Sequence, residues 1–134
     1  MAEKILHYGH AKTKLLYHLI FSTKYRRNCL SEIRDDIMIA LNESEKESHY
    51  HILCAEVDKN HIHILIEFKP FLSITQVVRR LKQYTTNYIW THKEEYIKKY
   101  YWKNKRILWT NGYFCGTIGD VSEKIITDYI KNQG

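Results

Sequence analysis

The stretch from residue 61 to residue 68, His-Ile-His-Ile-Leu-Ile-Glu-Phe, constrains the fold of this chain more than any other part. Its isoleucine-rich run predicts a β-strand. Side chains alternate along a strand, so His61 and His63 share one face, and the apolar residues that follow each of them face the core. Two neighbouring imidazoles on a strand can bind one divalent cation. Histidines on a half-exposed strand can also be simple solvent-facing polar residues.

Other patterns place this strand in an alternating order of strands and helices. Ser31 is expected to cap one helix, and Ser73 with Gln76 forms a capping box that opens a longer one. The predicted elements are a strand at 14–23, a helix from 31, a hairpin of strands 50–57 and 61–68, a helix from 74, short strands at 107–109 and 113–118, and a terminal helix at about 120–133. This order predicts one α+β domain over residues 1–134, a ferredoxin-like (split β-α-β, RRM-like) antiparallel sheet with helices on one face and an added C-terminal helix.

Composition narrows the setting in which such a domain works. The chain has 134 residues, of which 44% are hydrophobic, enough for one domain with a single core. It contains no apolar run of the roughly 18 residues that would span a membrane, and its N-terminus lacks the pattern of a signal peptide. Its three cysteines are odd in number and scattered. We therefore expect a cytoplasmic protein with no membrane partner.

The basic residues point to a nucleic acid. Lys and Arg total 21 against 15 acidic residues, giving a net charge of +6. Aromatic residues are interleaved with the lysines and arginines between residues 79 and 109. This combination suits single-stranded nucleic acid, because its phosphates attract cations and its nucleobases stack on aromatic rings. The same aromatics can equally fill the core behind a basic helix. The predicted phosphate contacts are Lys24, Arg26, Arg27, Arg79 and Arg80.

The terminal helix carries a second pair of chemically useful side chains. Tyr129 and Gln133 are four residues apart and therefore share one helix face. A tyrosine oxygen can attack a phosphodiester to form a covalent intermediate, and a glutamine oxygen can complete a metal site begun by His61 and His63. Imidazole suits Mn²⁺ better than Mg²⁺. Taken alone, Tyr129 is also compatible with simple packing against the sheet.

Several of these segments, in this order, resemble one known family. His61-Ile62-His63 is similar to the His-hydrophobe-His (HUH) motif of the small single-tyrosine transposases of the TnpA type, found in minimal bacterial and archaeal insertion sequences. The stretches YHLIFSTKYRR (17–27), LWTNGYF (108–114) and TIG (117–119) resemble the family's first strand with its basic exit and its approach to the catalytic helix. DYIKNQ (128–133) resembles the catalytic helix itself. The likeness covers residues 14 to 133.

This resemblance implies a specific chemistry. Such proteins are DNA transposases that cleave and rejoin single-stranded DNA at insertion-sequence ends through a 5′-phosphotyrosine intermediate, with a divalent metal, Mg²⁺ or Mn²⁺, and no nucleotide cofactor. Carried over residue by residue, Tyr129 is the nucleophile, and His61, His63 and Gln133 are the metal ligands. The family also implies recognition of DNA hairpins at element ends, and a homodimer that in some members shares its active sites between subunits.

Two other classes of function remain open at this point. One is a non-catalytic RRM-like protein that binds single-stranded nucleic acid, although RRM domains carry paired aromatics on two central strands and strand 61–68 does not. The other is a related HUH protein with another role, such as a domesticated nickase acting on chromosomal hairpins or a replication-initiation nickase. A metal-dependent hydrolase is a weaker third alternative, because no general base lies near the histidines in sequence.

Overall fold

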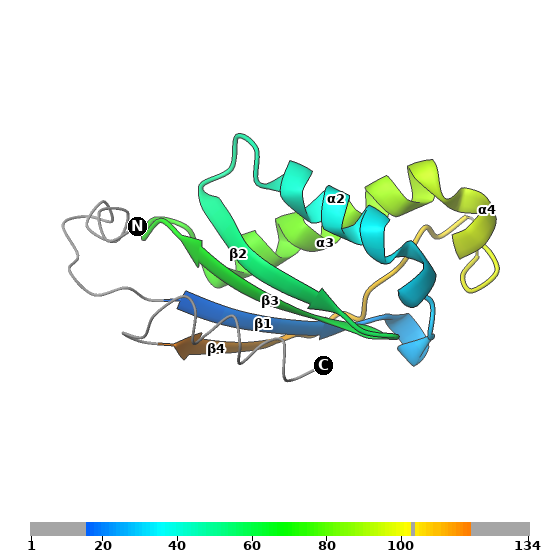
Figure 1. Cartoon of the computed structure of the whole chain (residues 1–134), viewed down its shortest axis with the longest axis horizontal. Coiled ribbons are helices and arrows are strands. Elements are labelled where there is room, and N and C mark those ends of the chain that lie inside the picture. The colour runs from blue at the N-terminus through cyan, green and yellow to red at the C-terminus, as the bar shows by residue number, and fades with distance from the viewer. Residues whose placement is uncertain (1–15, 103, 119–134) are drawn as a thin grey trace.

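The computed structural model describes residues 16–102 and 104–118, and it contains a four-stranded antiparallel sheet. Along the chain the strands are β1 (Leu16–Ser22), β2 (Tyr50–Val57), β3 (His61–Phe68) and β4 (Phe114–Ile118). In space their order is β2-β3-β1-β4, so the histidine strand is central and β1 lies beside it (Figure 1). The predicted α+β class with an antiparallel sheet is confirmed, as are the bounds of both arms of the β2–β3 hairpin.

The helices pack together on one face of this sheet (Figure 1). They are α2 (Arg34–Ser44), α3 (Ile74–His92) and the short α4 (Glu94–Ile97), with 3-10 turns η1 (Lys24–Arg26) and η2 (Ser31–Ile33). The capping box is confirmed: the Ser73 hydroxyl accepts a hydrogen bond from the Gln76 amide, and the Ser73 amide donates to the Gln76 side chain. The prediction that Ser31 caps the first helix is wrong, because Ser31 lies inside η2 and its side chain makes no capping bond.

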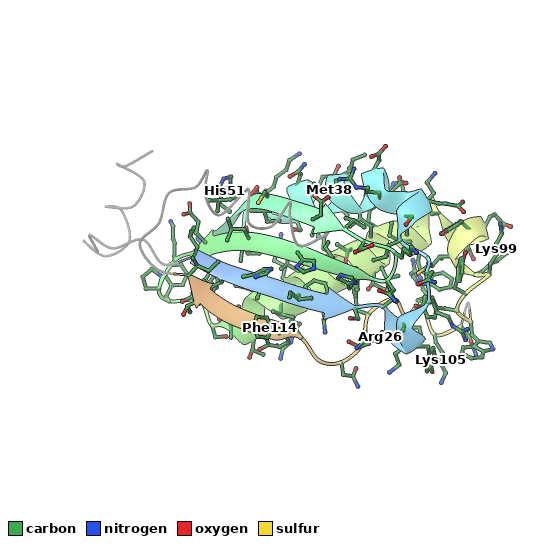
Figure 2. The ribbon with its side chains drawn as sticks, turned by 60° about the horizontal axis from the view of Figure 1, so that its bottom comes forward. Arg26, Met38, His51, Lys99, Lys105 and Phe114 are labelled. Carbon is green, nitrogen blue, oxygen red and sulfur yellow. The ribbon has the colours of Figure 1, made fainter. Side chains whose placement is uncertain are left out.

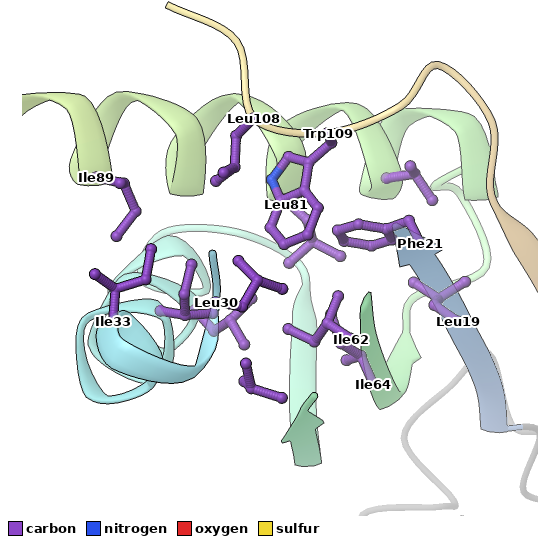
Figure 3. Packing of buried hydrophobic residues seen from close by; sticks show 14 of the residues in the cluster. Leu19, Phe21, Leu30, Ile33, Ile62, Ile64, Leu81, Ile89, Leu108 and Trp109 are labelled. Atoms are coloured by element: carbon purple, nitrogen blue, oxygen red, sulfur yellow. The ribbon is translucent and has the colours of Figure 1, made fainter. Parts of the chain in front are cut away.

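The core lies between the helices and the sheet (Figure 3). As predicted, the isoleucines of β3 face this core together with Leu19 and Phe21 of β1, Leu81 of α3 and Trp109. Since alternate residues face opposite ways, His61 and His63 lie on the sheet face that points away from the helices. A smaller apolar cluster around Leu16 and Leu65 occupies that second face.

Two sequence predictions near the C-terminal end of the chain have different outcomes. Residues 107–109 do not form a strand, because Trp109 makes only an isolated antiparallel bridge to Thr23. The second short strand is present as β4, paired with β1. The predicted catalytic helix at about 120–133 lies outside the described residues.

Two broader expectations concern the whole chain. None of the helices within residues 16–102 and 104–118 is long and apolar enough to cross a bilayer. A single domain over residues 1–134 and a cytoplasmic location both stay predictions.

Candidate metal and DNA site

The structure places His61 and His63 side by side on β3. Their ring centroids are 5.0 Å apart, with 65° between the ring planes. Two imidazoles bound to one ion through metal–nitrogen bonds of about 2.1 Å have their centroids about 5 Å apart. The observed spacing therefore fits two ligands of a single cation without a change of backbone.

Each of these rings is held through its Nδ1 atom. His61 Nδ1 donates to Asn60 Oδ1 at 3.0 Å. His63 Nδ1 lies 3.2 Å from Nε2 of His18, and one of these two rings donates to the other. A partner at Nδ1 fixes the orientation of a metal-binding imidazole. In His63 this leaves Nε2 for an ion, whereas His61 Nε2 lies 3.5 Å from Asp58 Oδ2, a contact that an ion would have to replace.

His18 is a functional candidate that the sequence analysis did not identify. It lies on β1 with 4% of its surface exposed, and its ring stacks on that of His63. Burial lowers the pKa of both His18 and His63, and the nearby His61 lowers that of His63 further. Neutral imidazole is the form that binds metals. The alternation of side chains along β1 could have identified His18, because residue 18 falls on the sheet face opposite the core residues Leu19 and Phe21.

The histidine pair opens onto a groove of about 560 Å³. Arg26, just beyond the end of β1, lines the groove on one side, and Thr110, Gly112, Tyr113 and Phe114 form another wall. Figure 2 shows Phe114 on β4 and Arg26 beyond the end of β1, both along the lower edge of the sheet in this view. A hollow with two imidazoles and a guanidinium can hold an anionic group beside a cation.

Lys82 supports the far wall of this groove from the helix layer, a role that its sequence context did not indicate. Its Nζ atom donates to the backbone oxygens of Thr110 at 2.7 Å and Gly112 at 2.9 Å. Burial lowers its pKa. The loop between Trp109 and β4 is therefore tied to α3 by two charge-assisted bonds.

The histidine pair supplies only part of a metal site. Among residues 16–102 and 104–118, no group of three or more His, Cys, Asp or Glu side chains is arranged to hold an ion. The predicted third ligand, Gln133, and the predicted nucleophile, Tyr129, lie outside the described residues. The predicted metal set and nucleophile therefore stay predictions.

The five predicted phosphate contacts separate into two groups. Lys24, Arg26 and Arg27 follow β1 at the groove end of the sheet, whereas Arg79 and Arg80 belong to α3 in the helix layer. Arg80 has a structural task, because its guanidinium donates to the backbone oxygens of Ser44 and Lys46 at the end of α2.

The interleaved aromatics are mostly part of the core. Trp90 and Trp109 are buried, and their indole nitrogens donate to the backbone oxygen of Ile107 and the hydroxyl of Thr85. Tyr101 is buried as well, whereas Trp102 remains 59% exposed. The packing interpretation is therefore correct for most of these rings, and Trp102 is an exception.

Comparison with known proteins agrees with this geometry. The family described as "Transposase IS200 like" matches residues 11–133. The chain is 31% identical over 126 residues to the transposase for insertion sequence element IS200 from Salmonella typhimurium, covering 93% of this chain and 80% of that protein. It is 26% identical over 121 residues to the ISDra2 transposase TnpA from Deinococcus radiodurans, covering 90% and 84%.

Solved structures show the same fold. A crystal structure of a Deinococcus radiodurans R1 protein described as a transposase superposes with a TM-score of 0.71 at 26% identity, covering 93% of this chain and 94% of that one. A REP-associated tyrosine transposase bound to a REP hairpin superposes with a TM-score of 0.57 at 12% identity, covering 87% and 61%, a likeness of fold alone. The chain thus belongs to the IS200-like transposases, a family of DNA-processing enzymes related to the IS200 and ISDra2 transposases.

Proposed function

We propose that this transposase cleaves and rejoins single-stranded DNA at the ends of an insertion sequence, with Tyr129 as the nucleophile. The Tyr129 hydroxyl gives up its proton as its oxygen attacks a backbone phosphorus, and the bond from phosphorus to the 3′ oxygen breaks. The leaving 3′ oxygen takes up a proton, and the new 5′-phosphotyrosine bond retains the energy of the broken one. Attack by another 3′-hydroxyl reverses the step and joins a different pair of ends, so no nucleotide cofactor is needed.

The observation that carries this proposal is the pair of oriented imidazoles at the wall of a groove that also contains Arg26. His61 and His63 would hold Mg²⁺ or Mn²⁺, with Gln133 as the third ligand. A divalent cation bound there would polarise the non-bridging phosphate oxygens and stabilise charge on the leaving oxygen. Asn60 and His18 hold the two imidazole rings through their Nδ1 atoms, and a bound cation would take the place of Asp58 at His61 Nε2. The Arg26 guanidinium would bind the phosphate next to the scissile one.

Hairpins at the element ends are the proposed DNA partners. A protein of the same fold has been solved with a REP hairpin, which supports a hairpin ligand for this fold. In our proposal Lys24, Arg26 and Arg27 contact its phosphates. We further propose a homodimer in which the active sites are shared between subunits.

The non-catalytic RRM-like alternative receives little support from the sheet. An RRM stacks bases on aromatic side chains of its two central strands. On the groove face of β1 and β3 the side chains are instead Leu16, His18, Ile20, Ser22, His61, His63, Leu65 and Glu67. None of these is a phenylalanine, tyrosine or tryptophan, so this face is not suited to base stacking along its centre.

Cleavage of the chain's own element end tests the proposal. Single-stranded DNA carrying the palindromes that flank the gene should be cut in the presence of Mn²⁺ and left intact with a chelator. His61→Ala and His63→Ala should each abolish cutting, whereas His49→Ala, a change of an exposed histidine that precedes β2 and contacts Phe71, should not. Equal cutting by His63→Ala and the unchanged protein would refute the metal assignment.

A further inference from the structure

The loop that follows β1 has a backbone conformation that few large side chains adopt. Tyr25 and Arg26 have φ angles of 60° and 55°, in the left-handed region. The surroundings hold this conformation: the Lys24 amide donates to Leu108 O at 2.8 Å, and the Tyr101 hydroxyl donates to Lys24 O at 2.7 Å. Strain that the surroundings fix so firmly is often associated with function.

One consequence of this loop conformation is that an aromatic ring projects into solvent. Tyr25 is 56% exposed, and Trp102, which is 59% exposed, lies against it. Their ring centroids are 6.4 Å apart, and the ring planes are nearly perpendicular at 88°. Each ring therefore leaves part of a flat face open, and a planar group that stacks on one of these faces would meet the other ring at its edge.

Positive charge surrounds these rings. A pocket of about 550 Å³ beside them is lined by Arg27, Lys98, Lys99, Tyr100, Tyr101 and Trp102, and none of these six residues is acidic. The Arg27 guanidinium and the Lys24 ammonium lie 5.6 and 5.7 Å from the centre of the Tyr25 ring. Lys98 is partly neutralised by an ion pair with Glu95, but Lys99 and Arg27 remain available to an anion.

The pocket and the histidine groove are two hollows that meet consecutive residues of the loop after β1. Arg26 lines the groove, and the next residue, Arg27, lines the pocket. Figure 2 shows Arg26, Lys99 and Lys105 at the same end of the molecule, beyond the end of β1. A chain of phosphates that passes Arg26 would therefore meet Arg27 and then Lys99.

We infer that Tyr25 and Trp102 form a stacking site for an unpaired base of the single-stranded DNA that flanks the strand in the histidine groove, with Arg27 and Lys99 on its phosphates. This inference rests on the proposed function for the identity of the DNA. Aromatic faces combined with cations are the means by which proteins bind single strands irrespective of sequence. A duplex keeps its bases stacked on one another and cannot fill the site in this way.

Tryptophan fluorescence provides a direct test on the full chain. Trp102 is exposed while Trp90 and Trp109 are buried, so a base stacked on Trp102 should quench mainly its emission. Titration with an oligothymidylate of about 15 nucleotides should quench the protein and give its affinity. Trp102→Leu should remove the quenching and, with Tyr25→Leu, weaken binding at least about fivefold each, whereas Trp102→Phe should bind nearly as well as the unchanged protein.

Matched controls separate stacking from general loss of aromatic or basic surface. Phe71→Leu removes an exposed ring from another part of the surface, and Lys46→Gln removes a remote exposed cation; both should leave the affinity unchanged. Lys99→Gln should weaken binding and reduce its dependence on salt concentration. A blunt duplex of similar length should produce no quenching.

The outcomes distinguish this inference from the function on which it rests. Unaltered affinity in both Tyr25→Leu and Trp102→Leu, or binding of oligothymidylate without quenching, would overturn the stacking site even if the protein formed a covalent DNA adduct. Lack of any oligothymidylate binding would also overturn it and would direct attention to a protein partner for these rings. Quenching without metal-dependent DNA cleavage would support the stacking site and count against the proposed chemistry alone.

Discussion

Nε2 of His18 lies 3.2 Å from Nδ1 of His63, so a buried histidine of β1 holds a groove-lining histidine of β3. The two strands are adjacent in the sheet although the residues are 45 positions apart in sequence. This contact occupies one nitrogen of His63 and directs the other toward the groove. The ability of the site to bind a cation should therefore depend on a residue that does not itself touch the cation.

Replacement of His18 should weaken metal binding. His18→Phe removes the partner of His63 Nδ1 and should lower the affinity for Mn²⁺ by about 10- to 100-fold, as loss of such supporting contacts typically does. His18→Gln retains a polar group and should lose less. Calorimetric titration with Mn²⁺ measures the difference, and thermal melting verifies that both variants fold. Equal Mn²⁺ affinity in His18→Phe and the unchanged protein would show that His18 only fills space.

Removal of the Lys82 ammonium should loosen the loop that carries Thr110 and Gly112 at the wall of the groove. Lys82→Met keeps most of the side-chain length but removes the bonds to Thr110 and Gly112, and should cost about 1–3 kcal/mol in the free energy of unfolding. Hydrogen exchange should accelerate locally in residues 110–113. Lys69→Met, which changes an exposed lysine, is the control for urea unfolding. An unchanged exchange pattern in Lys82→Met would contradict this role.

Adjacent arginines of α3 should behave differently when changed. Arg80→Met removes the donor that binds the carbonyl oxygens of Ser44, the last residue of α2, and of Lys46 in the turn that follows, and should lower the free energy of unfolding by about 1–2 kcal/mol. Both arginines are exposed, but within the described part of the chain the Arg79 side chain makes no such bonds, so Arg79→Met should change this free energy by less than about 0.5 kcal/mol. Chemical unfolding of the two variants side by side measures the contrast. Similar losses in both would mean that the contacts of Arg80 contribute little.

Stability should fall at alkaline pH because buried acids, Cys29 and Tyr101 among them, keep their protons in the folded chain. Burial raises the pKa of the Cys29 thiol above its usual 9.0 and that of the Tyr101 phenol above its usual 10.0. Above those usual values the unfolded chain loses protons that the folded chain keeps, so the free energy of unfolding must decrease as pH rises. Urea unfolding at about pH 8 and about pH 10.5 measures the decrease. Cys29→Ala should make the decrease smaller, and an identical pH dependence in that variant would exclude the thiol as a cause.

Local sequence patterns predicted those helices and strands that are determined by residues close together in the sequence. Strict alternation fixed the faces of β3, and the Ser73 and Gln76 pair marked the first turn of α3, because both signals depend only on nearby residues. The prediction for Ser31 is wrong because serine, which often caps helices, lies here inside a 3-10 turn. Residues 107–109 look like a strand, but Trp109 packs its ring on Phe21 and bonds to Thr85 in the core.

The site was predictable only in part, because only contacts between residues close in sequence leave a local pattern. His61 and His63 are close in sequence, so their pairing followed from spacing. His18 and Lys82 reach the site through strand pairing and through packing of α3 against a loop, and no local pattern encodes either contact. Tyr25 and Trp102 meet across the end of the molecule, 77 positions apart, and spacing along the chain could not reveal that pair.

The covalent intermediate is the most direct measure of the central claim, that a tyrosine of this transposase attacks DNA. The full chain is incubated with Mn²⁺ and labelled single-stranded DNA from its own element end, then denatured, and any adduct is digested and mapped by mass spectrometry. We predict a DNA-linked protein with the phosphate on Tyr129, absent in Tyr129→Phe although that variant still binds the hairpin. An adduct that persists in Tyr129→Phe, or that maps to Tyr25 or Tyr113, would contradict the assignment.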